Sequence, residues 1–142
     1  MPRKLQQYDL ASDAWIDIVT AEGSFGHTTT RISGEALSGH KVVITGTDGS
    51  AYYADNTNAD HTYIILGVTT GATILGATSR IQVFGEITEP SWTWTLNQPI
   101  FLNGSLGQLS QTAPISGFSQ IIGYPITATS MFIKIDRPIT LV

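Results

Sequence analysis

Short runs of β-branched and apolar residues alternate with glycine-rich turns along most of the chain. Residues 41–45 (KVVIT) predict a strand, and the turn at 47–50 (TDGS) predicts a hairpin with 50–54 as the returning strand. The same pattern predicts further strands over residues 63–68, 79–88, 99–102, 118–122 and 130–135. Because Thr, Ile and Val fit a pleated surface better than a helix, we predict an all-β fold, a small antiparallel β-barrel or sandwich.

Alternation within these runs assigns side chains to faces. In the last strand one face takes Met131, Ile133 and Ile135. Trp92 and Trp94 alternate with threonines, which predicts one more strand with both indoles on the same side. Within residues 79–88 one face is expected to hold Ile81, Val83 and Gly85. The other face is expected to hold Gln82, Phe84 and Glu86.

Glycine and proline are expected to break the pattern rather than to join it. Gly123 and Pro125 are predicted to separate the last two strands. Helical signal is confined to a turn or two within residues 5–14 or 72–77, and residues 55–60 predict a polar loop or a single helical turn.

Residues 1–32 differ from the rest of the chain. They hold Arg3, Lys4 and several carboxylates but only one short apolar run, at 15–19. Such a segment buries too little surface to order itself alone. We therefore predict an N-terminal arm or peripheral strand over 1–32, and a β-barrel or sandwich domain over 33–142 that folds without it. The arm is expected to attach to a partner by adding a strand to a sheet edge, through Arg3, Lys4, Trp15, Ile16 and Ile18.

Residues 90–133, the neutral segment, contain no Asp, Glu, Lys or Arg. Polar residues interrupt every apolar run in it long before the roughly 18 residues of a membrane span, so no membrane partner is expected. A water-facing monomer keeps charge on its surface to stay unassociated. The neutral segment therefore predicts a homo-oligomer. The aromatic residues proposed for its packing or subunit interface are Trp92, Trp94, Phe101 and Phe118.

Composition narrows the class of protein further. The net charge of -4 gives no basic face for nucleic acid, so no nucleic-acid partner is expected. The chain has no cysteine, which excludes disulfides, thiol catalysis and Cys-ligated zinc. The polar residues that follow Arg3 and Lys4 do not resemble a secretory signal, so synthesis in a cytoplasm is expected.

The sequence contains no clear motif for a catalytic or metal site. The histidines His27, His40 and His61 are scattered, and no Gly-x-Ser-x-Gly elbow is present, so a Ser-His-Asp triad stays a minor alternative. The loop at 55–60 is rich in oxygen ligands but lacks EF-hand spacing, which favours Asx-turns over calcium. We predict a non-enzyme without cofactor or metal.

Two carboxylates near the tryptophans raise a second alternative. Glu86 and Glu89 beside Trp92 and Trp94 resemble the composition of a carbohydrate site. Opposite strand faces and the neighbouring Pro90 favour solvated strand-end charges instead. Packing is the favoured role of the tryptophans, and a sugar-stacking platform is the alternative.

A set of short strings resembles structural proteins of tailed bacteriophages. The strings are GEALSGHKVVI at 34–44, YADNTN at 53–58, ILGVTT at 65–70, SWTW at 91–94, QPIFL at 98–102, GQLSQTAP at 107–114 and GFSQIIG at 117–123. Their order resembles capsid decoration (cement) proteins over about residues 34–142, and the module also resembles phage tail-fibre domains.

The resemblance implies a small β-barrel or sandwich, often a trimer, that binds the outside of a capsid between major capsid protein subunits. The expected function is a virion structural protein, made in the host cytoplasm, that stabilises the shell by bridging major capsid proteins. The alternative is a tail-fibre or baseplate module that binds host-surface carbohydrate.

Overall fold

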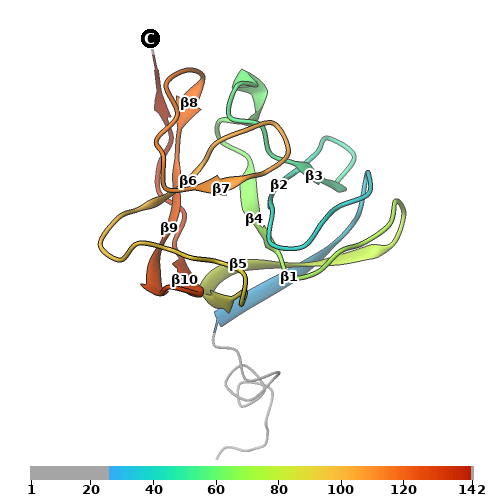
Figure 1. The fold of residues 1–142 in the computed structure, drawn as a ribbon. Coiled ribbons are helices and arrows are strands. Elements are labelled where there is room, and N and C mark those ends of the chain that lie inside the picture. The colour runs from blue at the N-terminus through green and yellow to red at the C-terminus, as the bar shows by residue number, and fades with distance from the viewer. Residues whose placement is uncertain (1–25, 142) are drawn as a thin grey trace, which may run out of the picture.

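The computed structural model describes residues 26–141 (Figure 1). One 3-10 turn, η2 (Ala59–His61), lies in the polar loop that the sequence predicts there. The strands of the described residues are β1 (Gly26–Ile32), β2 (Val42–Thr45), β3 (Ala51–Tyr53), β4 (Ile65–Thr69), β5 (Thr78–Thr88), β6 (Ile100–Leu102), β7 (Leu109–Ser110), β8 (Phe118–Ser119), β9 (Ile121–Thr127), β10 (Ser130–Ile133) and β11 (Ile139–Thr140). The all-β prediction is confirmed. No helix among residues 26–141 is long and apolar enough to cross a membrane.

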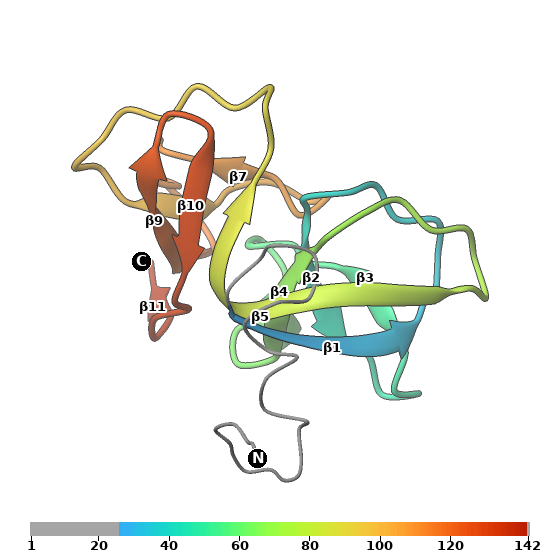
Figure 2. The ribbon, with the colours of Figure 1, turned by 90° about the horizontal axis from the view of Figure 1, so that it is seen from below.

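Nine of these strands form one curled antiparallel sheet. Its order is β3-β2-β4-β5-β10-β9-β6-β7, with β1 paired to β5 beside this path, and β11 and β8 form a second, two-stranded sheet. The ribbon views separate β1–β4 from β6–β10, and the long β5 joins the two halves (Figures 1 and 2). The four strands at one end of the order, β10, β9, β6 and β7, all come from the neutral segment.

The two ends of the sheet approach each other at Gly107. The amide of Gly107 donates to the carbonyl of Ala54, and the amide of Val42 donates to the carbonyl of Gly107. Gly107 has φ +67°, and a Cβ there would lie 2.2 Å from the Val42 carbonyl oxygen. Only glycine combines this backbone conformation with so close an approach. The sheet thereby curls far enough to enclose a core.

The main core lies inside the curl. Its buried side chains are Val42, Ile44, Ala54, Val68, Ile87, Ile100, Leu102, Phe118, Ile122, Met131 and Ile133. Ile135 packs against this cluster, so the predicted inward face of the last strand is confirmed. A smaller cluster of Leu37, Val43, Ala51 and Ile81 lies on the other face of the first half.

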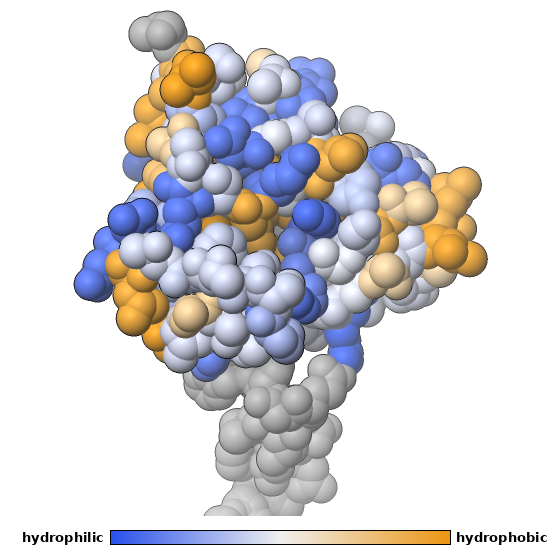
Figure 3. Space-filling model, viewed as in Figure 1, coloured by the Kyte–Doolittle hydropathy of each residue, from blue (hydrophilic) through white to orange (hydrophobic). Residues whose placement is uncertain are grey.

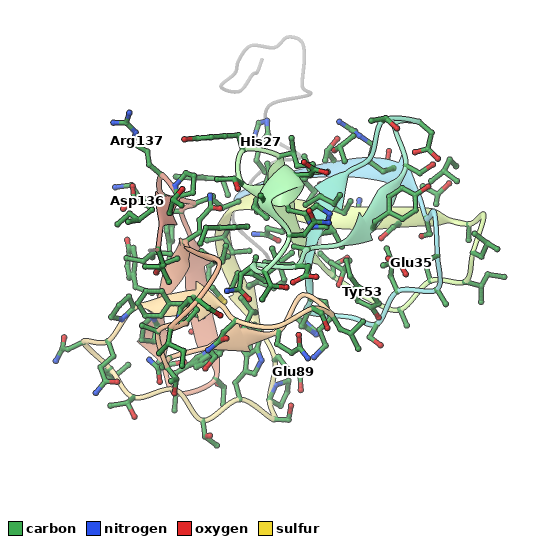
Figure 4. All side chains as sticks on the ribbon, turned by 90° about the horizontal axis from the view of Figure 1, so that it is seen from above. His27, Glu35, Tyr53, Glu89, Asp136 and Arg137 are labelled. Carbon is green, nitrogen blue, oxygen red and sulfur yellow. The ribbon has the colours of Figure 1, made fainter. Side chains whose placement is uncertain are left out.

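The free edge of β3 is covered by the loop that precedes β2. The amide of Gly34 donates to the carbonyl of Ala51, and the amide of Tyr53 donates to a carboxylate oxygen of Glu35 at 2.9 Å (Figure 4). Covering an edge in this way prevents unwanted pairing with another strand.

The structure corrects two expectations about strands. The segment around Trp92 and Trp94 forms no strand, because the Trp92 amide closes a turn onto the Glu89 carbonyl and the Trp94 amide bonds to Ala128. Gly123 and Pro125 lie inside β9 instead of separating strands. Pro125 is tolerated because the ladder is irregular there: it lies opposite Met131, beside a register shift.

Gln82 and Phe84, which were expected to share a face of β5, differ in burial, since Phe84 is exposed and Gln82 is not. The Gln82 side chain is buried, and its amide donates to the carbonyls of Phe84 and Glu86. The cause is a register shift opposite His27 and Thr28, which breaks the simple alternation of faces in β5. Residues 72–77 form turns and no helix.

The predicted arm, 1–32, falls into two parts. Residues 26–32 form β1, which lies antiparallel to β5 along residues 78–85 (Figure 2). Residues 1–25, which include the possible helical turn within 5–14, lie outside the described residues.

Candidate functional site

Two loops bring His40, Glu89, Trp92 and Trp94 together, a group we name the Trp cluster. The Trp92 and Trp94 rings lie 5.1 Å apart between centroids, at 47°. The His40 ring meets Trp92 edge-on at 5.3 Å, and its Nδ1 lies 3.7 Å from Glu89 Oε1. His40 has φ 59°, an uncommon left-handed conformation for a side-chain-bearing residue.

Glu89 is fixed by its neighbour Ser91. The amide and the hydroxyl of Ser91 both donate to Glu89 Oε2. The hydroxyl bond, followed by the amide bond, lowers the pKa of Glu89 below its ordinary value of 4.5. Glu89 is therefore a carboxylate at neutral pH, and it accepts hydrogen bonds within the turn that it shares with Ser91.

The two tryptophans are half-buried and pack against the main core. The Trp94 Nε1 atom is buried and has no hydrogen-bond partner among the described residues. The expectation of both indoles on one side is met by their mutual contact, although no strand holds them. Their packing leaves less ring surface for a stacked sugar than two exposed indoles would offer.

The other two aromatic residues proposed for packing or an interface differ from each other. Phe118 is 2% exposed and belongs to the main core. Phe101 is half-buried on β6, opposite Ser110 of β7 and Ile121 of β9.

A row of three aromatic side chains lies on the face of the sheet away from the main core. This aromatic strip consists of Phe84, Phe132 and Tyr124. Phe132 contacts Phe84 edge-on at 5.0 Å and Tyr124 in a stacked arrangement at 5.7 Å. Phe84 and Tyr124 are 47% and 48% exposed.

The aromatic strip has only a weak signal in the sequence. Its signal was alternation in the last strand, where Phe132 lies between Met131 and Ile133 and must face away from them. The neighbours that the strip gains from β5 and β9 follow only from strand pairing.

Exposed apolar side chains extend across the neutral segment. They include Leu96, Leu106, Ile115, Tyr124 and Ile126. Figure 3 shows hydrophobic surface at the margin of the molecule over β9 and β10, and again over the β4–β5 loop, where Ile74 and Leu75 are exposed.

The oxygen-rich loop at 55–60 uses its side chains locally. Asp55 Oδ1 accepts from the amide and hydroxyl of Thr57, and Asn58 Oδ1 accepts from the Asp60 amide. Asn56 is buried and donates to the carbonyls of Ser116 and Phe118 while accepting from Gly104. The bonds of Asp55 and Asn58 are the local Asx-type hydrogen bonds that the sequence favoured, whereas Asn56 joins the loop to distant segments.

The described residues also bear on the metal sites that the sequence made minor alternatives. No group of three His, Asp or Glu side chains is placed to hold a metal ion there. Figure 4 places His27 and Glu89 on opposite sides of the molecule. The proposed attachment residues Arg3, Lys4, Trp15, Ile16 and Ile18 lie outside the described range.

Comparison with known proteins gives no family. No protein-family model matches the chain, and no curated protein matches it either.

Proposed function

We propose that the chain is a virion structural protein, a capsid decoration subunit that stabilises a shell by bridging major capsid proteins. The observation that supports this function most directly is the gathering of the neutral segment into one half of the sheet. Strands β10, β9, β6 and β7 are neighbours, so a stretch without charge in the sequence becomes a contiguous region without charge in space.

That region also exposes apolar side chains. Leu96, Leu106 and Ile126 are 50%, 54% and 40% exposed. Interface cores are depleted in charged residues and enriched in aromatic ones. A surface of this composition is better suited to contact with protein than with water alone, either with further copies of this chain or with a capsid protein.

The bridging mechanism is multivalent. Each copy contributes modest apolar and backbone contacts to the shell, and an oligomer raises the effective concentration of the remaining contacts once one copy is bound. A trimer is the proposed assembly, in line with the resemblance to decoration proteins.

Cosedimentation with expanded capsids of the phage whose genome encodes the chain tests the proposal. We expect saturable binding of the full-length protein and its loss in the variant Leu96→Glu/Ile126→Glu. The matched control is Ile74→Glu/Leu75→Glu, which places two charges on exposed apolar positions outside the neutral segment. Absence of binding, or a coding sequence outside any phage or prophage genome, overturns the proposal.

The alternative is a tail-fibre or baseplate module that binds carbohydrate. The observation that favours it is the aromatic strip, whose half-exposed rings are held on a sheet and offer flat faces to a sugar. Binding of the purified protein to host-surface glycans, lost in Tyr124→Ala, together with no binding to capsids, would establish this alternative.

A further inference from the structure

The aromatic strip has no cover among the described residues. Phe84 and Tyr124 remain 47% and 48% exposed, although Phe132 between them contacts both rings. The strip continues into an open groove of about 370 Å³, lined by Tyr124, Pro125 and Pro99 among others. Three adjoining aromatic rings and a groove form an apolar surface of the kind that proteins use for contacts.

The described chain begins directly beside this strip. Gly26 pairs with Gly85, and His27 pairs with Phe84 itself. Gly26 has φ +150°, and a Cβ on it would lie 2.3 Å from the Phe84 carbonyl oxygen. Glycine at this position lets the chain pass close against Phe84, so residues 1–25 join the fold at one end of the strip.

The preceding residues contain one apolar run of suitable length. Trp15, Ile16, Ile18 and Val19 surround Asp17, and residues 20–25 connect the run to Gly26. An extended chain spans at most about 3.3–3.6 Å per residue, so this connection reaches about 25 Å. The centroid separations along the strip are only 5.0 and 5.7 Å. The whole strip is within reach of the run.

We propose that residues 15–19 of the same chain dock on the aromatic strip and cover it. Ile16 and Ile18 have the two-residue spacing that places both side chains on one side of an extended segment, against Phe132 and Tyr124. Two charged residues adjoin the strip: Glu86 lies opposite Phe132 on β5, and the exposed Lys134 follows Phe132 by two residues. Lys134 offers the positive charge for Asp17. This role replaces the attachment to a partner that the sequence alone suggested for the run, and it does not depend on the proposed function.

The tether favours the chain's own segment over one from another molecule. A segment tethered by a short linker is held near its site at an effective concentration in the millimolar range. The same segment of a neighbouring copy is present only at the micromolar concentration of the protein, which is far below this effective concentration. The strip is therefore covered by its own chain before a second copy competes for it.

Disulfide trapping tests the docking, because the native chain contains no cysteine to interfere. The full-length variant Ile18→Cys/Tyr124→Cys is oxidised at micromolar concentration and analysed on a non-reducing gel. We expect one crosslinked species with the mass of a single chain. The matched control is Ile18→Cys/Ile115→Cys, whose second site is 96% exposed on the loop before β8, and it should stay uncrosslinked.

Thiol labelling provides a second measurement that does not require crosslinking. The thiol of full-length Tyr124→Cys should react slowly, and adding Ile16→Ser and Ile18→Ser should speed the reaction. Docking in about nine molecules out of ten predicts about a tenfold increase, since only the undocked fraction reacts. Equal labelling rates of Tyr124→Cys with and without the two serine substitutions would overturn the proposal, as would crosslinks that form only between chains. A crosslink within a single chain together with the increase in labelling rate supports it.

Discussion

Phe132 of β10 lies directly opposite Tyr124 of β9, and their rings stack on the face away from the core, 5.7 Å apart at 26°. Their neighbours on β10, Met131 and Ile133, are fully buried on the other face. The same two strands therefore build the core on one side and an aromatic surface on the other. The aromatic face is the one on which we propose that residues 15–19 dock, and the proposed assembly surface of this half is formed by other exposed apolar side chains, Leu96 and Ile126.

Replacing Phe118 should destabilise the fold severely. The side chain is 2% exposed within the main core, so Phe118→Ala removes buried surface and leaves a cavity. We expect a loss of about 3–5 kcal/mol in the free energy of unfolding, measured by denaturant titration. Ile115→Ala, at a 96% exposed position on the same connection, should change stability by less than about 0.5 kcal/mol. A mild effect of Phe118→Ala would contradict its place in the core.

The tryptophan pair should act through packing. Trp92→Ala and Trp94→Ala each remove a half-buried indole that contacts the core, so we expect losses of about 2–4 kcal/mol, at or below the range for a fully buried aromatic. Trp→Phe at each position keeps an aromatic ring and should retain more stability. Unchanged thermal melts combined with loss of glycan binding would instead identify a sugar platform.

Glu89 predicts a specific dependence of stability on pH. Its pKa is lowered in the folded state, so its contribution is fully present above the ordinary value of 4.5 and is lost as the pH falls through the lowered value. Ser91→Ala removes the hydroxyl donor and should raise the pKa of Glu89, as measured by NMR titration of its carboxyl carbon.

The same variant should lose stability relative to the native chain at neutral pH. That difference should disappear in acid, where Glu89 is protonated in both proteins. Ser105→Ala, at an exposed serine, is the control and should show no such trend. A stability difference that persists in strong acid would contradict the assigned cause.

Two deletions separate the parts of the predicted arm. Every core side chain of the described residues lies at or after Leu37, so removing 1–25 or 1–32 should leave a folded domain. The deletion of 1–32 also removes β1 and exposes the backbone of β5 along residues 78–85. We expect this deletion to melt at a lower temperature than the deletion of 1–25 and to aggregate more readily. Equal melting temperatures would mean that β1 contributes nothing to the sheet.

Local patterns predicted the hairpin of β2 and β3, the long β5 and the inward face of β10, because alternation and turn residues act over a few positions. For residues 1–32 they left an arm and a peripheral strand open and did not delimit β1, because its GHTTTRI sequence is too polar to stand out from an arm although its threonines favour strands. They also placed a strand at Trp92 and Trp94, where bonds to Glu89 and Ala128 impose turns and loops.

The candidate surface was predictable only in part. The absence of charge between residues 90 and 133 is visible in the sequence and led directly to the expectation of an interface. That β10, β9, β6 and β7 become neighbours, and that Phe84 joins Phe132 and Tyr124, depends on long-range pairing. Such pairing is set by the whole sheet and has no local signature.

The most direct test of the account is the mass of the full-length protein in solution, measured by sedimentation equilibrium at micromolar concentration. We predict a species near 46 kDa, three times the 15.3 kDa of one chain. Leu96→Glu/Ile126→Glu should reduce it to a monomer, because the introduced charges would be buried without partners at the interface. Ile74→Glu/Leu75→Glu should leave it unchanged. A native chain that stays at 15.3 kDa throughout, or an equal effect of both double variants, would contradict the claim that the neutral half of the sheet is an assembly surface.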